Sequence, residues 1–128
     1  MRWLLDTNVA IHLRDGDAVT SAKIADLDGS PVLSIVTRIE LEGGVYQVPH
    51  DASRRRARLD TMFELIEILD LDATSADAYR AIMEALGFSR RKVLDRMIAA
   101  HALVRDIPLI TRNCDDFRDI PGLKLVEW

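Results

Sequence analysis

The sequence predicts an α/β domain in which helices flank a central, mainly parallel sheet of about five strands. Short apolar runs alternate along the chain with segments of helical periodicity, which is the pattern of β-α-β units. The chain has 128 residues, close to the commonest size of one domain, and contains no repeat, linker or low-complexity segment. We therefore expect one domain, residues 1–128, with one hydrophobic core.

The first half of the chain is expected to contain two strands, each followed by helices. The elements are, in order, strand 2–5, helices 7–13 and 19–27, strand 32–35, and helices 37–45 and 53–69. Thr7 follows the acid that closes the first strand, and it opens a plausible helix start. Gly29 and Pro31 mark a turn before the second strand. Pro49 interrupts the later helical pattern, which therefore indicates a helical hairpin.

The second half is expected to contain three further strands. The elements are strand 69–71, helices 74–86 and 92–104, and strands 109–111 and 123–126. Gly87 ends the first of these helices, because glycine readily adopts the backbone angles found just past a helix end. Pro121 and Gly122 form a turn before the last strand.

Composition excludes several classes of protein. The apolar runs are much too short to span a bilayer, and the N-terminus lacks the basic leader and cleavage site of a secreted protein. The single cysteine, Cys114, cannot form an internal disulfide and has no thiol partner for a zinc site. We therefore expect a cytoplasmic protein in which Cys114 is a packing residue.

Four acidic residues lie where a predicted strand ends or a helix begins, at the edge where open α/β sheets bind ligands: Asp6, Glu40, Asp95 and Asp116. Taken singly, each has an ordinary explanation as an exposed helix residue or a local cap. Clustered carboxylates would repel one another and raise their pKa values, and a bound cation removes that cost. The sequence therefore predicts a divalent-metal site, and hard oxygen ligands favour Mg²⁺ or Mn²⁺.

Basic residues are concentrated in two places. The formal net charge of −4 would by itself argue against a nucleic-acid partner. Two clusters depart from this average: Arg54, Arg55, Arg56 and Arg58, and Arg90, Arg91, Lys92 and Arg96. Either could be a solvated helix face, and this alternative is stronger for the first. A phosphate-cutting enzyme needs cations beside its acids to hold the substrate backbone.

The four acids occur in four short segments. These are Leu4-Leu5-Asp6-Thr7-Asn8-Val9, Thr37-Arg38-Ile39-Glu40-Leu41, Asp95-Arg96-Met97-Ile98-Ala99-Ala100-His101-Ala102 and Thr111-Arg112-Asn113-Cys114-Asp115-Asp116-Phe117. In order and spacing they resemble the four motifs of PIN-domain ribonucleases, and most of all those of the VapC toxins of bacterial toxin–antitoxin operons. The resemblance covers essentially the whole chain. It implies a Rossmann-like sheet and a Mg²⁺- or Mn²⁺-dependent endoribonuclease.

The resemblance also implies roles for individual residues. Asp6, Glu40 and Asp95 match the metal-binding, catalytic acids of the family directly. Family members often have an acid where this chain has Asn113, so Asp116 is assigned the fourth role, and a contribution from Asp115 or Asn113 stays open. Hydrogen bonds that position the carboxylates are expected from Thr7, Asn8, Thr111 and Asn113. The residues expected to contact RNA are Arg90, Arg91, Lys92, Arg96 and Arg112.

The implied reaction is hydrolysis of single-stranded or loop RNA by a metal-activated water. The metal lowers the pKa of the water and neutralises charge on the scissile phosphate. No histidine is required, and His12, His50 and His101 have no spacing typical of metal binding or acid–base catalysis. Neither the RNA target nor the number of metal ions follows from one sequence.

Two protein partners are implied by the resemblance. Members of this toxin family form homodimers and are neutralised by a small antitoxin whose tail occupies the groove near the acids. The helical hairpin of residues 38–69 is the expected clamp for that tail, with Tyr46 and Met62 as candidate contacts. Most other apolar residues of the hairpin are expected to be core.

Alternative functions stay open from the sequence. A phosphatase or a receiver domain also has an aspartate after its first strand. However, Asp6-Thr7-Asn8 lacks the second acid of aspartate phosphatases, and Leu109–Thr111 lacks the lysine of a receiver. A non-catalytic PIN module would bind RNA or protein without metal-dependent turnover. A housekeeping PIN nuclease would cut RNA without an antitoxin encoded beside it.

Overall fold

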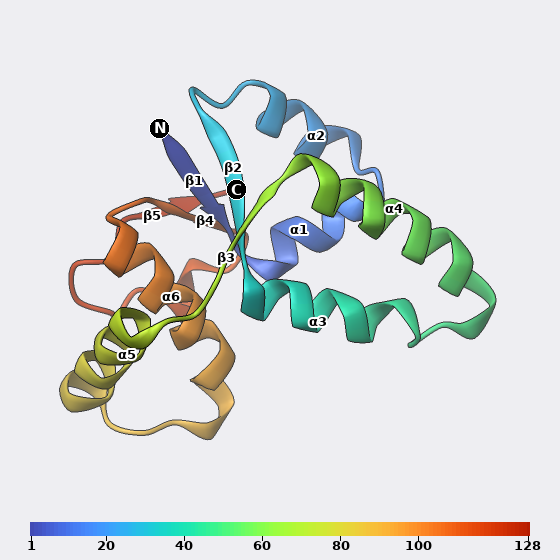
Figure 1. Ribbon diagram of the computed structural model, residues 1–128. Helices are drawn as coiled ribbons and strands as arrows, with labels where there is room; N and C mark the ends of the chain where they lie inside the picture. The colour runs from blue at the N-terminus through green and yellow to red at the C-terminus, as the bar shows by residue number, and fades with distance from the viewer.

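The computed structural model describes residues 1–128, which form five parallel strands with helices on both faces of the sheet (Figure 1). The strands are β1 (Arg2–Leu5), β2 (Ser30–Ser34), β3 (Glu67–Leu69), β4 (Leu109–Thr111) and β5 (Leu125–Glu127). Their order is β3-β2-β1-β4-β5, and every neighbouring pair is parallel. The strand order reverses beside β1, which is where sheets of this kind bind ligands. The predicted fold class is therefore confirmed.

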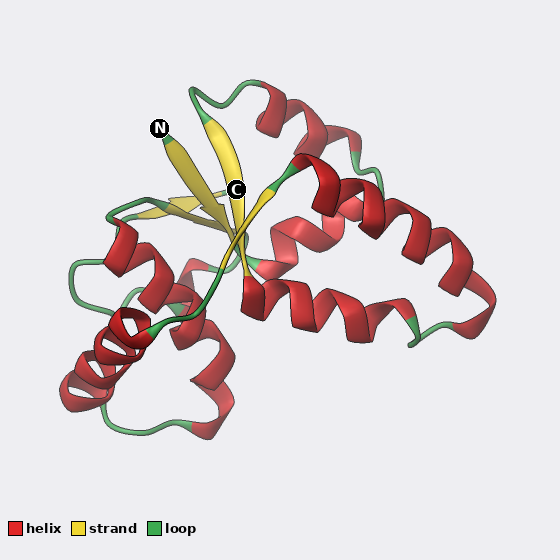
Figure 2. Cartoon of the chain, viewed as in Figure 1, coloured by secondary structure: helices red, strands yellow, loops and turns green.

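Helices connect the strands and form two groups beside the sheet. The α-helices are α1 (Thr7–Arg14), α2 (Ala18–Ala25), α3 (Ile35–Val45), α4 (Ala52–Leu65), α5 (Ala73–Leu86) and α6 (Val93–Arg105). Short 3₁₀ helices are η1 (Pro49–Asp51), η2 (Arg90–Lys92) and η3 (Cys114–Asp116). Figure 2 shows α3 and α4 extending to the right of the sheet, while α5 and α6 lie at the lower left.

The sheet is buried on both faces, and alternate residues of each strand point to opposite sides. Leu4 and Leu109 pack with residues of α5 and α6, whereas Leu5 and Ile110 pack with α1, α3 and α4. On α6, the alanines at positions 99, 100 and 102 are buried, so this helix approaches the sheet closely. That close approach brings the first turn of α6 to the carboxyl edge of the sheet.

Several predicted element boundaries are wrong. The helix predicted for residues 53–69 ends at Leu65, because the backbone is extended from Ile66 onward. Ile35 begins α3 instead of ending β2, because the Ser34 hydroxyl accepts a hydrogen bond from the backbone N–H of Val36 and caps the helix. The third strand is Glu67–Leu69 instead of 69–71, because the backbone already becomes extended at Ile66. The last strand is 125–127 instead of 123–126, since its register with β4 begins at Leu125.

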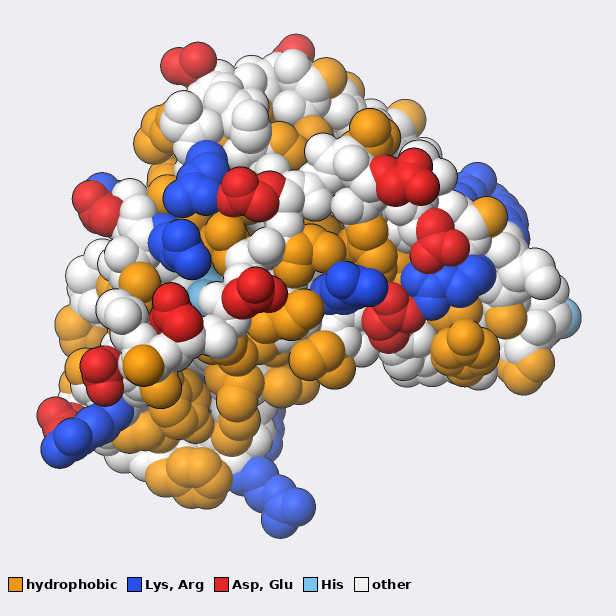
Figure 3. Space-filling model, viewed as in Figure 1, with side chains coloured by type: hydrophobic (Ala, Val, Ile, Leu, Met, Phe, Trp, Pro, Cys, Tyr) orange, Lys and Arg blue, Asp and Glu red, His pale blue; other side chains and the backbone are white.

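The two helical groups enclose a hollow on the face seen in Figure 3, and hydrophobic side chains gather along its sides. Strands β1 and β2 run toward the inner end of this hollow in Figure 1, so the carboxyl edge of the sheet faces it. This edge carries the starts of α1 and α3.

None of the helices combines the length and the apolar character needed to cross a membrane.

His101 is buried on α6, with 0% of its surface exposed. Neither ring nitrogen makes a hydrogen bond of ordinary geometry, although the backbone of Asp70 lies near enough to favour the charged form. Burial has the largest effect and lowers the pKa of the imidazole, and the charge of Arg105 lowers it further. His101 is therefore held neutral inside the fold.

We expect the neutral His101 to make the fold less stable in mild acid. Its folded-state pKa lies below the ordinary value of 6.5, so its contribution is complete above pH 6.5 and is lost as the pH falls through the folded pKa. Urea unfolding of the native chain and of His101→Leu, both in EDTA, measures the effect. The native chain should lose stability relative to the variant between about pH 7.5 and about pH 5. Parallel pH profiles would contradict the assignment.

Candidate active site

Four acidic side chains from four parts of the chain meet at the carboxyl edge. Asp6 follows β1 directly, Glu40 lies in the second turn of α3, Asp95 in the first turn of α6, and Asp116 in η3 after β4. Burial is the largest cause that raises the pKa of Asp6, and the charges of Glu40 and Asp116 raise it further. Burial likewise raises the pKa of Glu40, and the charge of Asp95 adds to the effect. The four carboxylates therefore form one electrostatically coupled cluster, which we call the acid cluster.

Asp6 is the most enclosed of the four, with 5% of its surface exposed. Its Oδ1 accepts a hydrogen bond from the Thr7 backbone N–H at 2.8 Å, and its Oδ2 accepts one from the Thr111 hydroxyl at 2.7 Å. The Thr111 hydroxyl also accepts hydrogen bonds from the backbone N–H of Asn113 at 3.0 Å and from the Asn8 side-chain amide at 3.5 Å. These contacts fix the orientation of the Asp6 carboxylate.

A chain of hydroxyls positions Glu40. The Thr7 hydroxyl donates to Glu40 Oε1 at 2.8 Å and lies 2.9 Å from the Thr37 hydroxyl. Because the single hydroxyl hydrogen of Thr7 is used on Glu40, Thr37 must be the donor to Thr7. Thr37 is 0% exposed, and sequence reasoning missed its role. The available signal was spacing, since Thr37 precedes Glu40 by three residues and lies on the same helix face.

Asp95 has the most strongly shifted carboxyl group. Burial raises its pKa from 3.8 to about 6, the charges of Asp6 and Asp116 add to the rise, and Lys92 opposes it. No hydrogen bond contributes to the shift. The carboxylate is therefore held near other negative charges, and only Lys92 offsets part of their effect.

The two neighbouring aspartates of η3 differ in surroundings. Asp116 is half-buried, and its Oδ2 accepts a hydrogen bond from the Asn113 side-chain amide at 2.7 Å. Asp115 is exposed and forms an ion pair with Arg118. The structure thus places Asp116, and not Asp115, in the acid cluster, with Asn113 holding the Asp116 carboxylate.

The donors in the acid cluster fit a divalent cation chemically. All are oxygen atoms, which Mg²⁺ and Mn²⁺ prefer, and the uncompensated charge of the cluster favours a cation. As the side chains stand, however, no three His, Cys, Asp or Glu residues converge closely enough to hold a metal ion. The donor atoms therefore suit a cation in their chemistry, but not in their present spacing.

The residues predicted to contact RNA do not all reach the surface. Arg90, Arg91 and Arg112 are exposed and form no ion pair, while Lys92 is half-buried with its Nζ 3.8 Å from an Asp119 oxygen. The first three are therefore free to contact an anionic ligand at this edge.

Arg96 is a correction to the sequence prediction. It is 3% exposed, and its Nη1 donates to the backbone oxygen of Gly87 at 2.8 Å. Although it follows Asp95 in sequence, the next position on a helix points in a different direction. Arg96 therefore ties the start of α6 to the preceding loop and cannot reach RNA.

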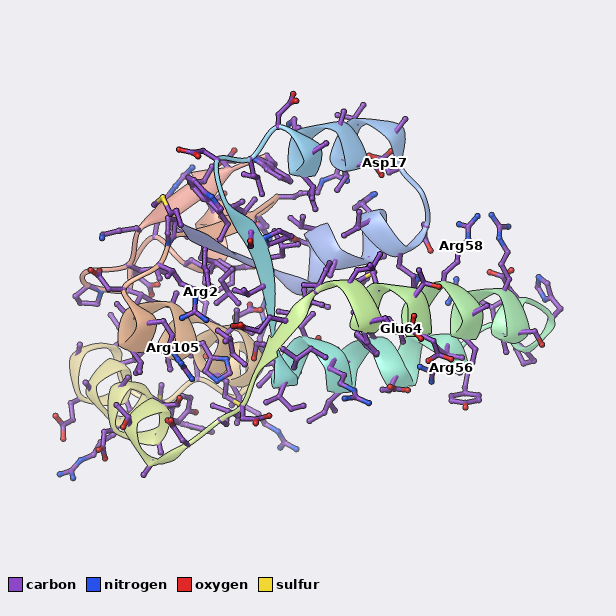
Figure 4. All side chains as sticks on the ribbon, turned by 45° about the horizontal axis from the view of Figure 1, so that its top comes forward. Arg2, Asp17, Arg56, Arg58, Glu64 and Arg105 are labelled. Carbon is purple, nitrogen blue, oxygen red and sulfur yellow. The ribbon has the colours of Figure 1, made fainter.

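The other basic cluster lies on α4 and is largely paired within the α3–α4 hairpin. Arg55 bonds to Asp51 and to the Gly44 carbonyl, and Arg56 forms ion pairs with Glu42 and Asp60. Figure 4 shows Arg56 on this helix, at the right of the view. This pairing leaves neither Arg55 nor Arg56 free for an anionic ligand.

Comparison with known proteins places this geometry in a family. The model of the PIN domain matches residues 3–123. The tRNA(fMet)-specific endonuclease VapC of Shigella flexneri is 30% identical over 133 residues, which cover 100% of this chain and 98% of that protein.

Solved structures have the same fold. DNA-bound VapBC from Salmonella typhimurium has a TM-score of 0.88 at 25% identity, and the match covers 100% of this chain and 98% of that chain. VapBC-5, a member of the VapBC family of toxin–antitoxin systems from Mycobacterium tuberculosis, has a TM-score of 0.74 at 26% identity, with coverage of 99% and 98%. Since the family model matches nearly the whole length and the Shigella relative aligns end to end, the chain belongs to the PIN domain family.

Proposed function

We propose that this chain is a metal-dependent endoribonuclease, the toxin of a toxin–antitoxin pair, which hydrolyses single-stranded or loop RNA. The observation that carries the proposal is the acid cluster, whose buried and half-buried carboxylates repel one another at the ligand-binding edge of the sheet. The relative from Shigella flexneri is named a tRNA(fMet)-specific endonuclease, and the relative from Mycobacterium tuberculosis belongs to a toxin–antitoxin system. Both support this class of substrate and partner.

The residues of the site have distinct tasks in this reaction. Asp6, Glu40, Asp95 and Asp116 would hold Mg²⁺ or Mn²⁺, which would supply charge neutralisation at the scissile phosphate and activate water. The hydroxyls of the surrounding threonines keep two of these carboxylates in fixed orientations. The exposed arginines of η2 precede α6 and are placed to bind neighbouring phosphates of the substrate.

The proposed activity predicts metal-dependent cleavage of RNA. Purified protein should cut single-stranded RNA in the presence of Mg²⁺ or Mn²⁺. EDTA should abolish this cleavage. Asp6→Ala should lower kcat/KM roughly 100-fold or more, because transition-state charge is no longer balanced. Thr37→Val should lower it roughly tenfold, because Glu40 is then less well positioned. Cleavage of an end-labelled RNA measures these rates.

The matched control for this assay is Asp115→Asn, which removes an exposed carboxylate next to Asp116 but outside the acid cluster. It should cut RNA at close to the native rate. Native cleavage rates in Asp6→Ala would show that the acid cluster is not the site of the reaction.

A further prediction concerns the stability cost of Asp95. In EDTA near neutral pH, Asp95→Asn should make the fold more stable by on the order of 1 to 2 kcal/mol, after the pKa shift of this half-buried group is discounted for solvent screening. The raised pKa of Asp95 means that its stabilising contribution is present below the ordinary value of 3.8 and is lost as the pH rises through about 6. Asparagine removes the charge that costs stability above that pH.

Urea unfolding with and without Mg²⁺ tests this prediction. Mg²⁺ should stabilise the native chain and Asp115→Asn, because a ligand that binds the folded state raises stability, but it should stabilise Asp95→Asn much less. Equal Mg²⁺ effects on all three proteins would remove Asp95 from the proposed metal site.

We further propose that an antitoxin binds a groove beside α4. The groove has a volume of about 600 Å³ and is lined by α1, α2 and α4, with apolar side chains that include Leu13, Ile24 and Leu65. None of the acid-cluster residues lines it, so it is not the groove near the acids that the resemblance implied, and only α4 of the predicted clamp contributes. Met62 lines the groove although it is almost buried, whereas Tyr46 is exposed and lies outside it.

Growth on expression tests the antitoxin groove. The native chain should arrest growth, and co-expression of the short protein encoded beside it should relieve the arrest. Leu65→Glu should still arrest growth but escape relief, because Leu65 is 80% exposed in the groove. The control Leu71→Glu alters an exposed leucine outside the groove and should remain neutralised. If co-expression relieves the growth arrest caused by Leu65→Glu, the antitoxin binds a different surface.

We also propose a homodimer, supported by the exposed hydrophobic side chains Ile39, Phe88 and Leu94. A contact between two copies would cover these side chains, and exposed apolar patches mark such interaction surfaces. Sedimentation of the purified chain as a monomer at micromolar concentration would refute this proposal.

A further inference from the structure

A second pocket lies at the carboxyl edge of the sheet, beside the acid cluster. It has a volume of about 290 Å³, and its lining includes His12, Asp17, Lys23, Arg112 and Trp128. These residues come from α1, the start of α2, the loop after β4, and the end of β5. None of them belongs to the acid cluster.

The backbone fixes two of these residues next to the acid cluster. Arg112 directly follows Thr111, and its N–H donates to the Asn8 side-chain oxygen at 3.4 Å. The N–H of Trp128 donates to the carbonyl oxygen of Thr111 at 2.9 Å. The Thr111 hydroxyl in turn bonds to Asp6. A strand of nucleic acid that crosses the acid cluster toward β5 therefore meets this pocket next.

The pocket has an excess of positive charge. Lys23 and Arg112 are exposed and form no ion pair. Asp17 is the one carboxylate among the lining residues, and its Oδ2 accepts hydrogen bonds from the Thr20 backbone N–H at 2.9 Å and from the Thr20 hydroxyl at 2.7 Å. Asp17 caps α2 and also lies near enough to Arg112 for their charges to interact. Two cations against one acidic side chain leave the pocket with a net positive charge for an anionic ligand.

The pocket also contains an aromatic surface. Trp128 is half-buried, with apolar neighbours of the α1–α4 side of the sheet behind it. Lys23 Nζ lies 5.6 Å from the centre of its ring. A flat aromatic ring beside cations is the combination that binds single-stranded nucleic acid, because a base stacks on the ring while the cations hold the phosphates.

We propose that this pocket holds a base and a phosphate of single-stranded RNA next to the scissile bond, with Trp128 stacking on the base and Lys23 and Arg112 binding the backbone. The proposal rests on the proposed function, since it extends the path of the same RNA beyond the acid cluster. Lys23, Arg112 and Trp128 are positioning residues. An acidic peptide would bind to Lys23 and Arg112 but would not stack on the ring of Trp128.

Tryptophan fluorescence provides a direct test. The chain has two tryptophans, so Trp3→Phe leaves Trp128 as the sole reporter. Titration with a single-stranded oligoribonucleotide in EDTA, where no cutting occurs, should quench this signal. In that background, Lys23→Ala and Arg112→Ala should each weaken binding roughly fivefold or more and lower the slope of log K against log salt by about 0.7. Trp128→Leu, followed by anisotropy of labelled RNA, should weaken binding roughly tenfold.

The matched control is Arg105→Ala, which removes another exposed arginine without an ion pair. Arg105 lies at the end of α6, and Figure 4 shows it on the opposite side of the view from Asp17. This variant should keep the native affinity and salt slope. In metal-dependent cutting assays, Lys23→Ala and Arg112→Ala should raise KM while leaving kcat within about twofold of native, because the acid cluster is intact.

The outcomes separate this proposal from the proposed function. If the native chain cuts RNA but the Lys23 and Arg112 variants bind it as Arg105→Ala does, the pocket proposal is overturned and the nuclease remains. If an acidic peptide quenches Trp128 and RNA does not, the pocket binds protein and the proposal is likewise overturned. If the native chain neither binds nor cuts RNA, both proposals are overturned together.

Discussion

The burial of one charged side chain, Asp6, is the constraint on which the rest of the site depends. A carboxylate at the end of the central strand β1 is removed from water, which raises its pKa and demands compensation. The parallel pairing of β1 with β4 supplies part of it by placing the Thr111 hydroxyl within hydrogen-bond distance. The remaining charge is left beside three other acids. The acid cluster therefore keeps negative charge that the protein does not neutralise, and this excess charge favours a bound cation.

The supporting fold makes this unfavourable cluster tolerable. Apolar side chains cover both faces of the sheet, and the small alanines of α6 allow the helix that carries Asp95 to approach closely. The hydroxyls of Thr7 and Thr37 then hold Glu40 in one place. Stability is lost locally at the acid cluster and regained in the core, a pattern expected where function needs buried charge.

Sequence reasoning predicted the sheet and the acids because both have strong local signals. Alternation of apolar runs with helical segments gives the strand count, and strand ends give the positions of Asp6 and Asp116. The direction in which each side chain points was harder to predict. Arg96 was assigned to the RNA surface from its neighbours in sequence, but its helix face turns it inward to Gly87. Thr37 was missed, because a buried hydroxyl is indistinguishable in sequence from an ordinary helix residue.

The charge of the whole chain is a poor guide to its partner, because charges of opposite sign are separated along one edge of the sheet. The acid cluster has basic neighbours of its own, because the arginines of η2 precede α6, which carries Asp95, and Arg112 follows Thr111, which bonds to Asp6. The central claim is that the acid cluster is a cation site. Electron paramagnetic resonance of Mn²⁺ titrated into the protein tests it most directly. The native chain and Asp115→Asn should bind Mn²⁺, whereas Asp6→Ala and Asp95→Asn should lose that binding. Native-like Mn²⁺ binding by both of these variants would contradict the account.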